Sequence, residues 1–152
     1  MLIIATILCV AVLAATVLMK RARDRDLLER HSITPEDLHR LLASHDDLAL
    51  FDVRHPLDLL ANSVVIPGAR RVAPEEVMAN PALIPREQDT VVYCTCPSDK
   101  TSRVVLRRAL ARGFLRTKFL KGGLEAWQAK GYPVERYDQT FHLSSTDAAP
   151  SR

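Results

Sequence analysis

Cys94 lies where an apolar strand is followed by a polar loop and then by a helix, an arrangement that favours a reactive thiol. The preceding residues, Val91-Val92-Tyr93, are β-branched and aromatic and are typical of a buried strand. Pro97-Ser98-Asp99 interrupts regular structure, and the hydroxyl of Thr101 or Ser102 can cap the next helix. Free N–H groups and the positive end of the helix dipole would then face the cysteine and favour its thiolate. We therefore predict that Cys94 is a nucleophile in an anion-binding cradle.

The predicted cradle consists of the loop after Cys94 and the first turn of the helix. Its substrate-binding residues are Thr95, Cys96, Pro97, Ser98, Asp99, Lys100 and Thr101, with Ser102 in support. Lys100 would attract an anionic substrate, whereas Asp99 would oppose it. No histidine is near Cys94 in the sequence, so backbone N–H groups and the helix dipole would have to stabilise the thiolate. His55 follows a strand end and could reach the mouth of the site.

Cys96 has two interpretations. It is either an ordinary loop residue, which we favour, or a sulfur relay or redox partner of Cys94. The spacing of Cys94 and Cys96 suits a structural disulfide poorly, and Cys9 belongs to an apolar N-terminal segment, so the domain is expected in a reducing compartment. Two thiols supply too few ligands for a metal site. We expect neither a metal nor a cofactor.

Asp52-Val53-Arg54 closes the strand predicted over Leu48–Val53, and Asp52 and Arg54 are interpreted as supporting residues. Asp52 is expected to accept hydrogen bonds from backbone or loop groups, and Arg54 is expected to pair with a nearby acid. The alternative is that Arg54 draws anions to the pocket. Either role places both side chains near the carboxyl end of a strand, where function collects in parallel sheets.

The N-terminal segment, residues 1–19, contains no charged side chain and would span roughly 28 Å as a helix. Basic residues follow it: Lys20, Arg21, Arg23 and Arg25. We predict a transmembrane helix over residues 1–19, a basic juxtamembrane linker over residues 20–33 and a cytoplasmic C-terminal domain. The alternative for residues 1–19 is a signal peptide with an unusual start. The net charge of +3, without basic residues interleaved with aromatic ones, does not indicate a nucleic-acid partner.

Residues 34–137 are predicted to form one domain in which helices and strands alternate. Short connections between alternating elements indicate an α/β fold whose parallel sheet is covered on both faces. Cys94 and Arg54 both follow strand ends in this interpretation. Residues 138–152 are polar, small and Pro-containing, and we predict a disordered tail there.

Several short motifs, in order, resemble a single rhodanese domain. They are Asp52-Val53-Arg54, Ile66-Pro67-Gly68-Ala69, Val92-Tyr93-Cys94, Gly122-Gly123-Leu124-Glu125-Ala126-Trp127 and Gly131-Tyr132-Pro133-Val134. The resemblance implies a five-stranded parallel sheet with helices on both sides. It also implies a sulfurtransferase that carries sulfur as a persulfide on Cys94, taken from a small anionic donor such as thiosulfate and passed to a thiol or to cyanide. The resemblance does not indicate a particular protein partner.

The loop departs from the family pattern. It looks one residue longer than usual, and Lys100 stands where the family often has Arg. The longer spacing resembles the related cell-cycle tyrosine phosphatases, which close their loop with an Arg that forks around phosphate. Lys100 offers only a point charge at such a bidentate site. We therefore expect a sulfurtransferase, with two alternatives: a catalytically weak binding or redox-sensing module at the membrane, and a Cys-dependent phosphatase.

Overall fold

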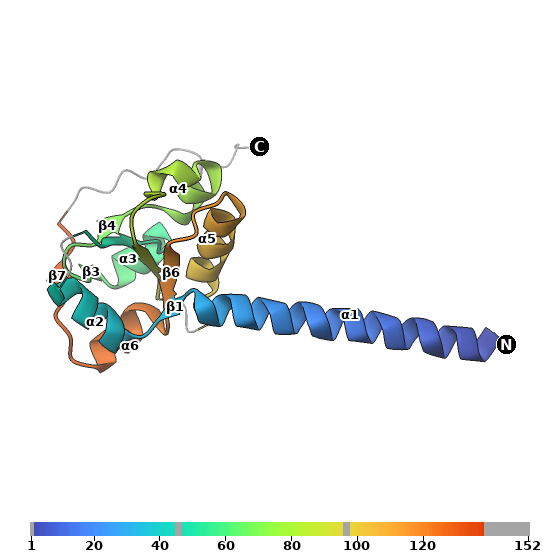
Figure 1. The fold of residues 1–152 in the computed structure, drawn as a ribbon. Helices are drawn as coiled ribbons and strands as arrows, with labels where there is room; N and C mark the ends of the chain where they lie inside the picture. Colours follow the sequence, from blue (N-terminus) through green and yellow to red (C-terminus); the bar gives the residue numbers. More distant parts are fainter. Residues whose placement is uncertain (1, 45–46, 96–97, 139–152) are drawn as a thin grey trace, which may run out of the picture. The chain divides into compact units, whose positions relative to one another are not determined.

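The computed structural model describes residues 2–44, 47–95 and 98–138, and the chain divides into two compact units after Ser32 (Figure 1). The first unit is formed by helix α1 (Leu2–Arg30), which continues through the basic segment expected to be a linker. Within the residues that the structure describes, no helix is long and apolar enough to cross a membrane. The membrane span predicted for residues 1–19 is therefore not supported, and the tail predicted over residues 138–152 lies outside the described residues except for Asp138.

The second unit is built on a five-stranded sheet in the order β1-β6-β5-β2-β4. Its strands are β1 (Ser32–Ile33), β2 (Ala49–Asp52), β4 (Arg70–Arg71), β5 (Thr90–Tyr93) and β6 (Thr117–Leu120). β5 pairs in parallel with both β2 and β6, and β2 pairs in parallel with β4. Asp52 is the register partner of Tyr93, so the carboxyl ends of β2 and β5 lie at one edge of the sheet. The predicted five-stranded parallel sheet is confirmed.

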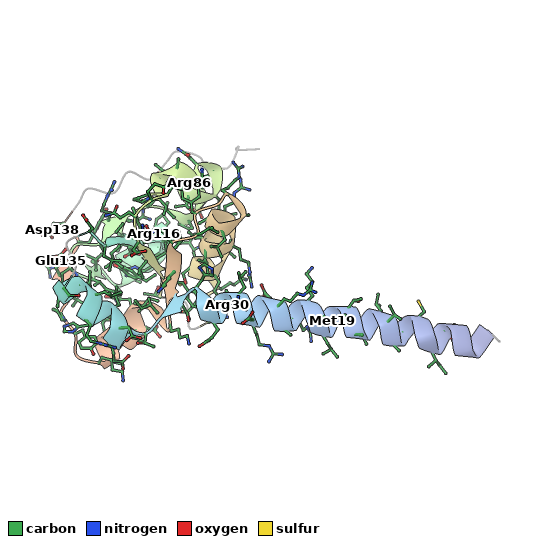
Figure 2. All side chains as sticks on the ribbon, viewed as in Figure 1. Met19, Arg30, Arg86, Arg116, Glu135 and Asp138 are labelled. Carbon is green, nitrogen blue, oxygen red and sulfur yellow. The ribbon has the colours of Figure 1, made fainter. Side chains whose placement is uncertain are left out.

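The second unit also contains a two-stranded sheet. β3 (Val64–Val65) lies outside the main sheet and forms an antiparallel pair with β7 (Glu135–Arg136), whose Glu135 is labelled in Figure 2. Val65 is the register partner of Glu135. The β3 strand is too short to show its partner in the sequence, because two valines fit either sheet equally well. This pair places the end of the domain beside the segment that follows β2.

Helices cover both faces of the sheet, as predicted. α2 (Pro35–Ser44) and α6 (Gly123–Ala129) contribute to one buried cluster with the sheet, which includes Leu38, Leu50, Val91, Leu124 and Trp127. The cluster on this face is completed by Ile33, Ile66, Tyr93 and Leu120. On the other face, α5 (Lys100–Ala111) packs on β5 and β6, and α4 (Pro74–Ala79) packs against α5 (Figure 1). The remaining helical segments are α3 (Pro56–Ala61) and the 3₁₀ turn η1 (Pro81–Leu83).

The helix starts follow from their sequences. The Asp37 amide donates to Thr34 Oγ1 over 3.2 Å, so Thr34 caps α2 ahead of Pro35. All four residues of β5 are buried, which is the pattern of a strand covered on both faces. Trp127 belongs to the core: it is buried, and its indole N–H donates to the Pro133 carbonyl over 2.8 Å.

Candidate active site

Cys94 directly follows β5 and is 1% exposed. Its Sγ atom lies 3.6 Å from Oγ of Ser102, a buried residue in the first turn of α5. The Ser102 hydroxyl donates to the Asp99 carbonyl over 3.0 Å. A hydroxyl can rotate, so the same group can donate to the sulfur once Cys94 is ionised. The thiol therefore lies beside the amino end of a helix, where a thiolate is stabilised.

The helix begins earlier than the predicted cap. α5 starts at Lys100, and Asp99 holds the N-cap position in a left-handed conformation with a φ of 52°. Thr101 and Ser102 therefore lie inside the first turn, and the prediction that one of them is the cap is wrong. Lys100, the residue expected to close the loop, is the first residue of α5, and the buried Asp99 precedes it.

The remaining loop residues differ in exposure. Thr95 is half-buried, while the side chains of Ser98 and Lys100 are exposed. Asp99 is buried, at 5% exposed. Cys96 and Pro97 lie outside the described residues, so the two interpretations of Cys96 both stay open.

The carboxylate of Asp99 bonds to a segment outside its own helix. Its Oδ2 atom accepts the Gly122 backbone N–H over 3.0 Å. Oδ2 also lies 3.9 Å from Nη2 of Arg103, whose guanidinium lies over the Phe119 ring. Burial raises the pKa of the Asp99 carboxyl, and the Gly122 N–H and the Arg103 charge oppose this rise. Oδ1 is buried without a hydrogen-bond partner among the described residues.

The turn before α6 lies against the backbone of Cys94. The Leu124 amide donates to the Cys94 carbonyl over 2.9 Å. A β-carbon built on Gly123 would lie only 2.0 Å from that same oxygen, so glycine is required there. Gly122 and Gly123 belong to a motif that carries the family resemblance, but the sequence analysis did not assign them to the site. The signal available in the sequence was a glycine pair one residue after a predicted strand, which can indicate close approach of another backbone.

Asp52 and Arg54 form a fully buried ion pair. Arg54 Nε lies 2.9 Å from Oδ1 and 2.8 Å from Oδ2 of Asp52. The guanidinium also donates to the carbonyls of Asn62, over 2.8 Å, and Val64, over 2.7 Å. The predicted pairing of Arg54 with an acid is confirmed. Because its guanidinium is turned toward these internal acceptors, Arg54 has a structural role.

His55 and Tyr93 lie at or just after the ends of β2 and β5. His55 is exposed, and its Nδ1 lies 2.9 Å from Oε1 of Glu75 on α4. The hydroxyl of Tyr93 accepts the Ile66 amide over 3.1 Å. Burial, together with the nearby Asp52 charge, raises the pKa of Tyr93. Tyr93 therefore stays neutral and joins β5 to the segment after β3.

A hollow of about 1010 Å³ lies at the opposite end of the sheet. It is lined by residues at the amino ends of β5 and β6, such as Thr90 and Lys118, and by Arg86 and Arg116, which Figure 2 labels. None of the predicted site residues lines it. In the part of the chain that the structure describes, no group of three or more His, Cys, Asp or Glu side chains could hold a metal ion.

The comparisons with known proteins agree with this geometry. The model of the rhodanese-like domain matches residues 34–130. A sulfurtransferase of Allochromatium vinosum is 29% identical over 104 residues, which cover 68% of this chain and 94% of that protein. The probable adenylyltransferase/sulfurtransferase MoeZ of Mycobacterium tuberculosis is 30% identical over 102 residues, which cover 67% of this chain and 26% of MoeZ.

Solved structures show the same fold. The Alr3790 protein of Anabaena sp. has a TM-score of 0.60 at 25% identity, covering 68% of this chain and 82% of its own. A rhodanese-related protein of Thermoplasma volcanium has a TM-score of 0.59 at 23% identity, covering 69% of this chain and 97% of its own. The domain match, which spans more than half of the sequence, is decisive: this chain belongs to the rhodanese-like domain family, in which its named relatives are sulfurtransferases.

Proposed function

We propose that this protein transfers sulfane sulfur from a small anionic donor, such as thiosulfate, to a thiol or to cyanide through a persulfide on Cys94. The observation that carries the proposal is the position of Cys94 after β5, with its sulfur 3.6 Å from Ser102 at the start of α5. Sulfurtransferase relatives support the reaction class. Their low identity leaves donor and acceptor to be inferred from the site.

The reaction proceeds in two displacements at sulfur. The Cys94 thiolate attacks the outer sulfur of thiosulfate; an S–S bond forms on Cys94, the S–S bond of the donor breaks, and sulfite leaves with the bonding electrons. An acceptor thiolate or cyanide then attacks the outer sulfur of the persulfide. The Cys94 thiolate leaves with its electron pair, so the enzyme returns to its starting state without a redox cofactor.

The protein's contribution is to keep Cys94 ionised and to receive an anion. The helix dipole and the hydroxyl of Ser102 favour the thiolate in both displacements, when it is the nucleophile and when it is the leaving group. Lys100, exposed at the first position of α5, supplies positive charge for the donor. Arg54 is not proposed to bind the donor, because its guanidinium is held by Asp52 and two carbonyls.

The test is to incubate the reduced protein with thiosulfate and to locate the added sulfur by mass spectrometry. We expect one additional sulfur atom on the peptide that contains Cys94, removed by cyanide with release of thiocyanate. Cys9→Ser should behave as wild type, and Cys94→Ser should take up no sulfur. Turnover of thiosulfate by Cys94→Ser would contradict the proposal.

A catalytically weak binding or redox-sensing module is the second candidate. The buried acid at the last position of the loop favours it, because a carboxylate there opposes an anionic donor. Absence of a persulfide with thiosulfate and with neutral persulfide donors would favour this candidate. The phosphatase alternative is not favoured, because Lys100 offers a point charge where a phosphate site of this kind needs the forked guanidinium of an Arg.

We also propose that residues 1–19 attach the protein to a membrane with the domain in the cytoplasm. The proposal rests on the sequence, since this stretch carries no charge and basic residues follow it at once. Membrane fractionation of the full chain, with carbonate washing, tests it. A full-length chain that stays in the supernatant, or a shortened product, would contradict it.

A further inference from the structure

We propose that Asp99 is a positioning residue for Cys94: its carboxylate fastens the start of α5 to the turn before α6, and so holds the helix N-terminus against the thiol. The inference rests on the proposed role of Cys94 as nucleophile. It assigns to Asp99 a role within the protein, in addition to its place in the predicted cradle.

The side chain of Asp99 is used in an unusual way for its position. An Asp at an N-cap ordinarily accepts an N–H from the first turn of its own helix. Asp99 makes no such capping bond. Its Oδ2 instead accepts the N–H of Gly122, which is 23 residues later in the chain. The carboxylate therefore links two segments rather than capping one.

The bond between Asp99 and Gly122 belongs to a closed series of contacts around Cys94. On one side, the sulfur contacts the Ser102 hydroxyl, which donates to the Asp99 carbonyl. On the other side, the Cys94 carbonyl accepts the Leu124 amide. Gly122 and Leu124 belong to the same turn, so the Asp99 carboxylate completes the series. Removing it would leave the start of α5 free to shift relative to the backbone of Cys94.

Asp99 occupies this place despite two destabilising features. Its backbone is left-handed, a conformation that Asp and Asn tolerate better than most residues other than glycine. Its carboxyl is also buried, and burial raises its pKa. An exposed cap would avoid the desolvation, so the link to Gly122 is the feature that accounts for a buried acid here.

Two substitutions separate the link from charge and backbone strain. Asp99→Asn keeps an acceptor for the Gly122 N–H and tolerates the left-handed backbone, but it removes the charge. Asp99→Gly suits the same backbone and removes both the acceptor and the charge. The charged groups around this position are Arg103, whose Nη2 lies 3.9 Å from Oδ2, and Lys100 and Lys121, which are next to Asp99 and Gly122 in sequence. The two variants therefore differ in whether the side chain at position 99 can accept the Gly122 N–H.

The experiment measures modification of Cys94 by iodoacetamide as a function of pH, in a background with Cys9→Ser and Cys96→Ser. We expect Asp99→Gly to react about tenfold more slowly than its parent at neutral pH, with its midpoint moved to higher pH. Asp99→Asn should stay within about threefold of the parent. Asp138→Asn, which removes an exposed carboxylate, is the matched control. Either an unchanged Asp99→Gly protein or an equal loss in Asp99→Asn would overturn the proposal.

A measurement on the unmodified chain keeps the proposal testable if Asp99→Gly does not fold. The NMR shift of the Gly122 amide should titrate with the Asp99 carboxyl, at a pH above the ordinary range of Asp. An amide that shows no such titration would overturn the link. Iodoacetamide needs no sulfur donor, so failure of thiosulfate to load Cys94 would refute the proposed function and leave this test intact.

Discussion

The amide of Leu124 donates to the carbonyl of Cys94 over 2.9 Å, and this bond brings the α6 turn into direct contact with the backbone that carries the proposed nucleophile. The contact is close because Gly123 has no side chain: a β-carbon there would lie 2.0 Å from the same carbonyl oxygen. The geometry of the thiol is therefore set from both sides, by α5 through Ser102 and by the α6 turn through its backbone.

Gly123→Ala should destabilise the protein and weaken sulfur loading. The new methyl group would strike the Cys94 backbone, and the residue would also be forced to keep a φ of 53°, so a loss of about 2–4 kcal/mol in unfolding free energy is expected. Gly131→Ala is the control, since its φ is 70° with open space around it. Guanidinium unfolding measures both. Equal losses of unfolding free energy in the two variants would show that the close contact between Gly123 and the Cys94 carbonyl does not exclude a side chain.

Arg54→Met should be strongly destabilising. It leaves Asp52 as a buried carboxylate without its partner, which typically costs about 3–5 kcal/mol. Arg116→Met is a matched control, because Arg116, labelled in Figure 2, pairs with Asp89 at an exposed site and should matter little. Urea unfolding of both variants gives the comparison. If Arg54→Met lost no more stability than Arg116→Met, the buried pair would have no structural role.

Ser102→Ala should lower the reactivity of Cys94. The hydroxyl is 3.6 Å from the sulfur and can donate to the thiolate, so its removal should slow modification by iodoacetamide severalfold at neutral pH. Ser63→Ala is the control, since Ser63 also donates to a carbonyl, that of Leu60, but is exposed. The rates are read from mass spectra of the Cys94 peptide. A rate equal to that of Ser63→Ala would remove Ser102 from the site.

The raised pKa of the buried Asp99 carboxyl should make the unfolding free energy depend on pH. Burial raises the pKa of its carboxyl, so the folded state holds the proton at pH values where the unfolded chain has lost it. This group therefore stabilises the fold at low pH, and that contribution is lost as pH rises from the unfolded toward the folded pKa. Asp99→Asn should thus gain stability relative to wild type between about pH 3 and neutral pH. Denaturant unfolding of both proteins at the two pH values checks this. A difference in unfolding free energy between Asp99→Asn and wild type that is the same at both pH values would contradict it.

Lys100→Glu should slow loading from thiosulfate more than loading from a neutral persulfide donor. Reversing the charge at the start of α5 repels an anion and opposes the helix dipole. Lys118→Glu, which changes an exposed lysine on β6, is the control for net charge. Initial rates at low ionic strength make the comparison. Equal slowing with both donors would mean that Lys100 does not act on the donor's charge.

Local patterns in the sequence were enough to predict β5, the place of Cys94 and the parallel sheet. A run of β-branched residues ahead of a loop identifies a buried strand, and alternating elements indicate the layers. The N-cap of α5 was predicted at Thr101 or Ser102 instead of Asp99. Asp99 holds this position with a left-handed backbone, and nothing in the neighbouring sequence indicates that conformation. The pairing of β3 with β7 and the bond from Asp99 to Gly122 depend on contacts between distant segments, which local patterns do not contain.

The buried indole of Trp127 gives this protein an optical reporter of its own. It is the one tryptophan in the sequence, it lies on α6, and its N–H is tied to Pro133. The first turn of that helix carries the amide that holds the Cys94 carbonyl. Any displacement of α6 when the thiol is loaded or alkylated would alter the polarity around the ring and with it the emission spectrum. We therefore expect that chemistry at the sulfur, where it displaces α6, can be followed in real time by the fluorescence of Trp127, without a dye.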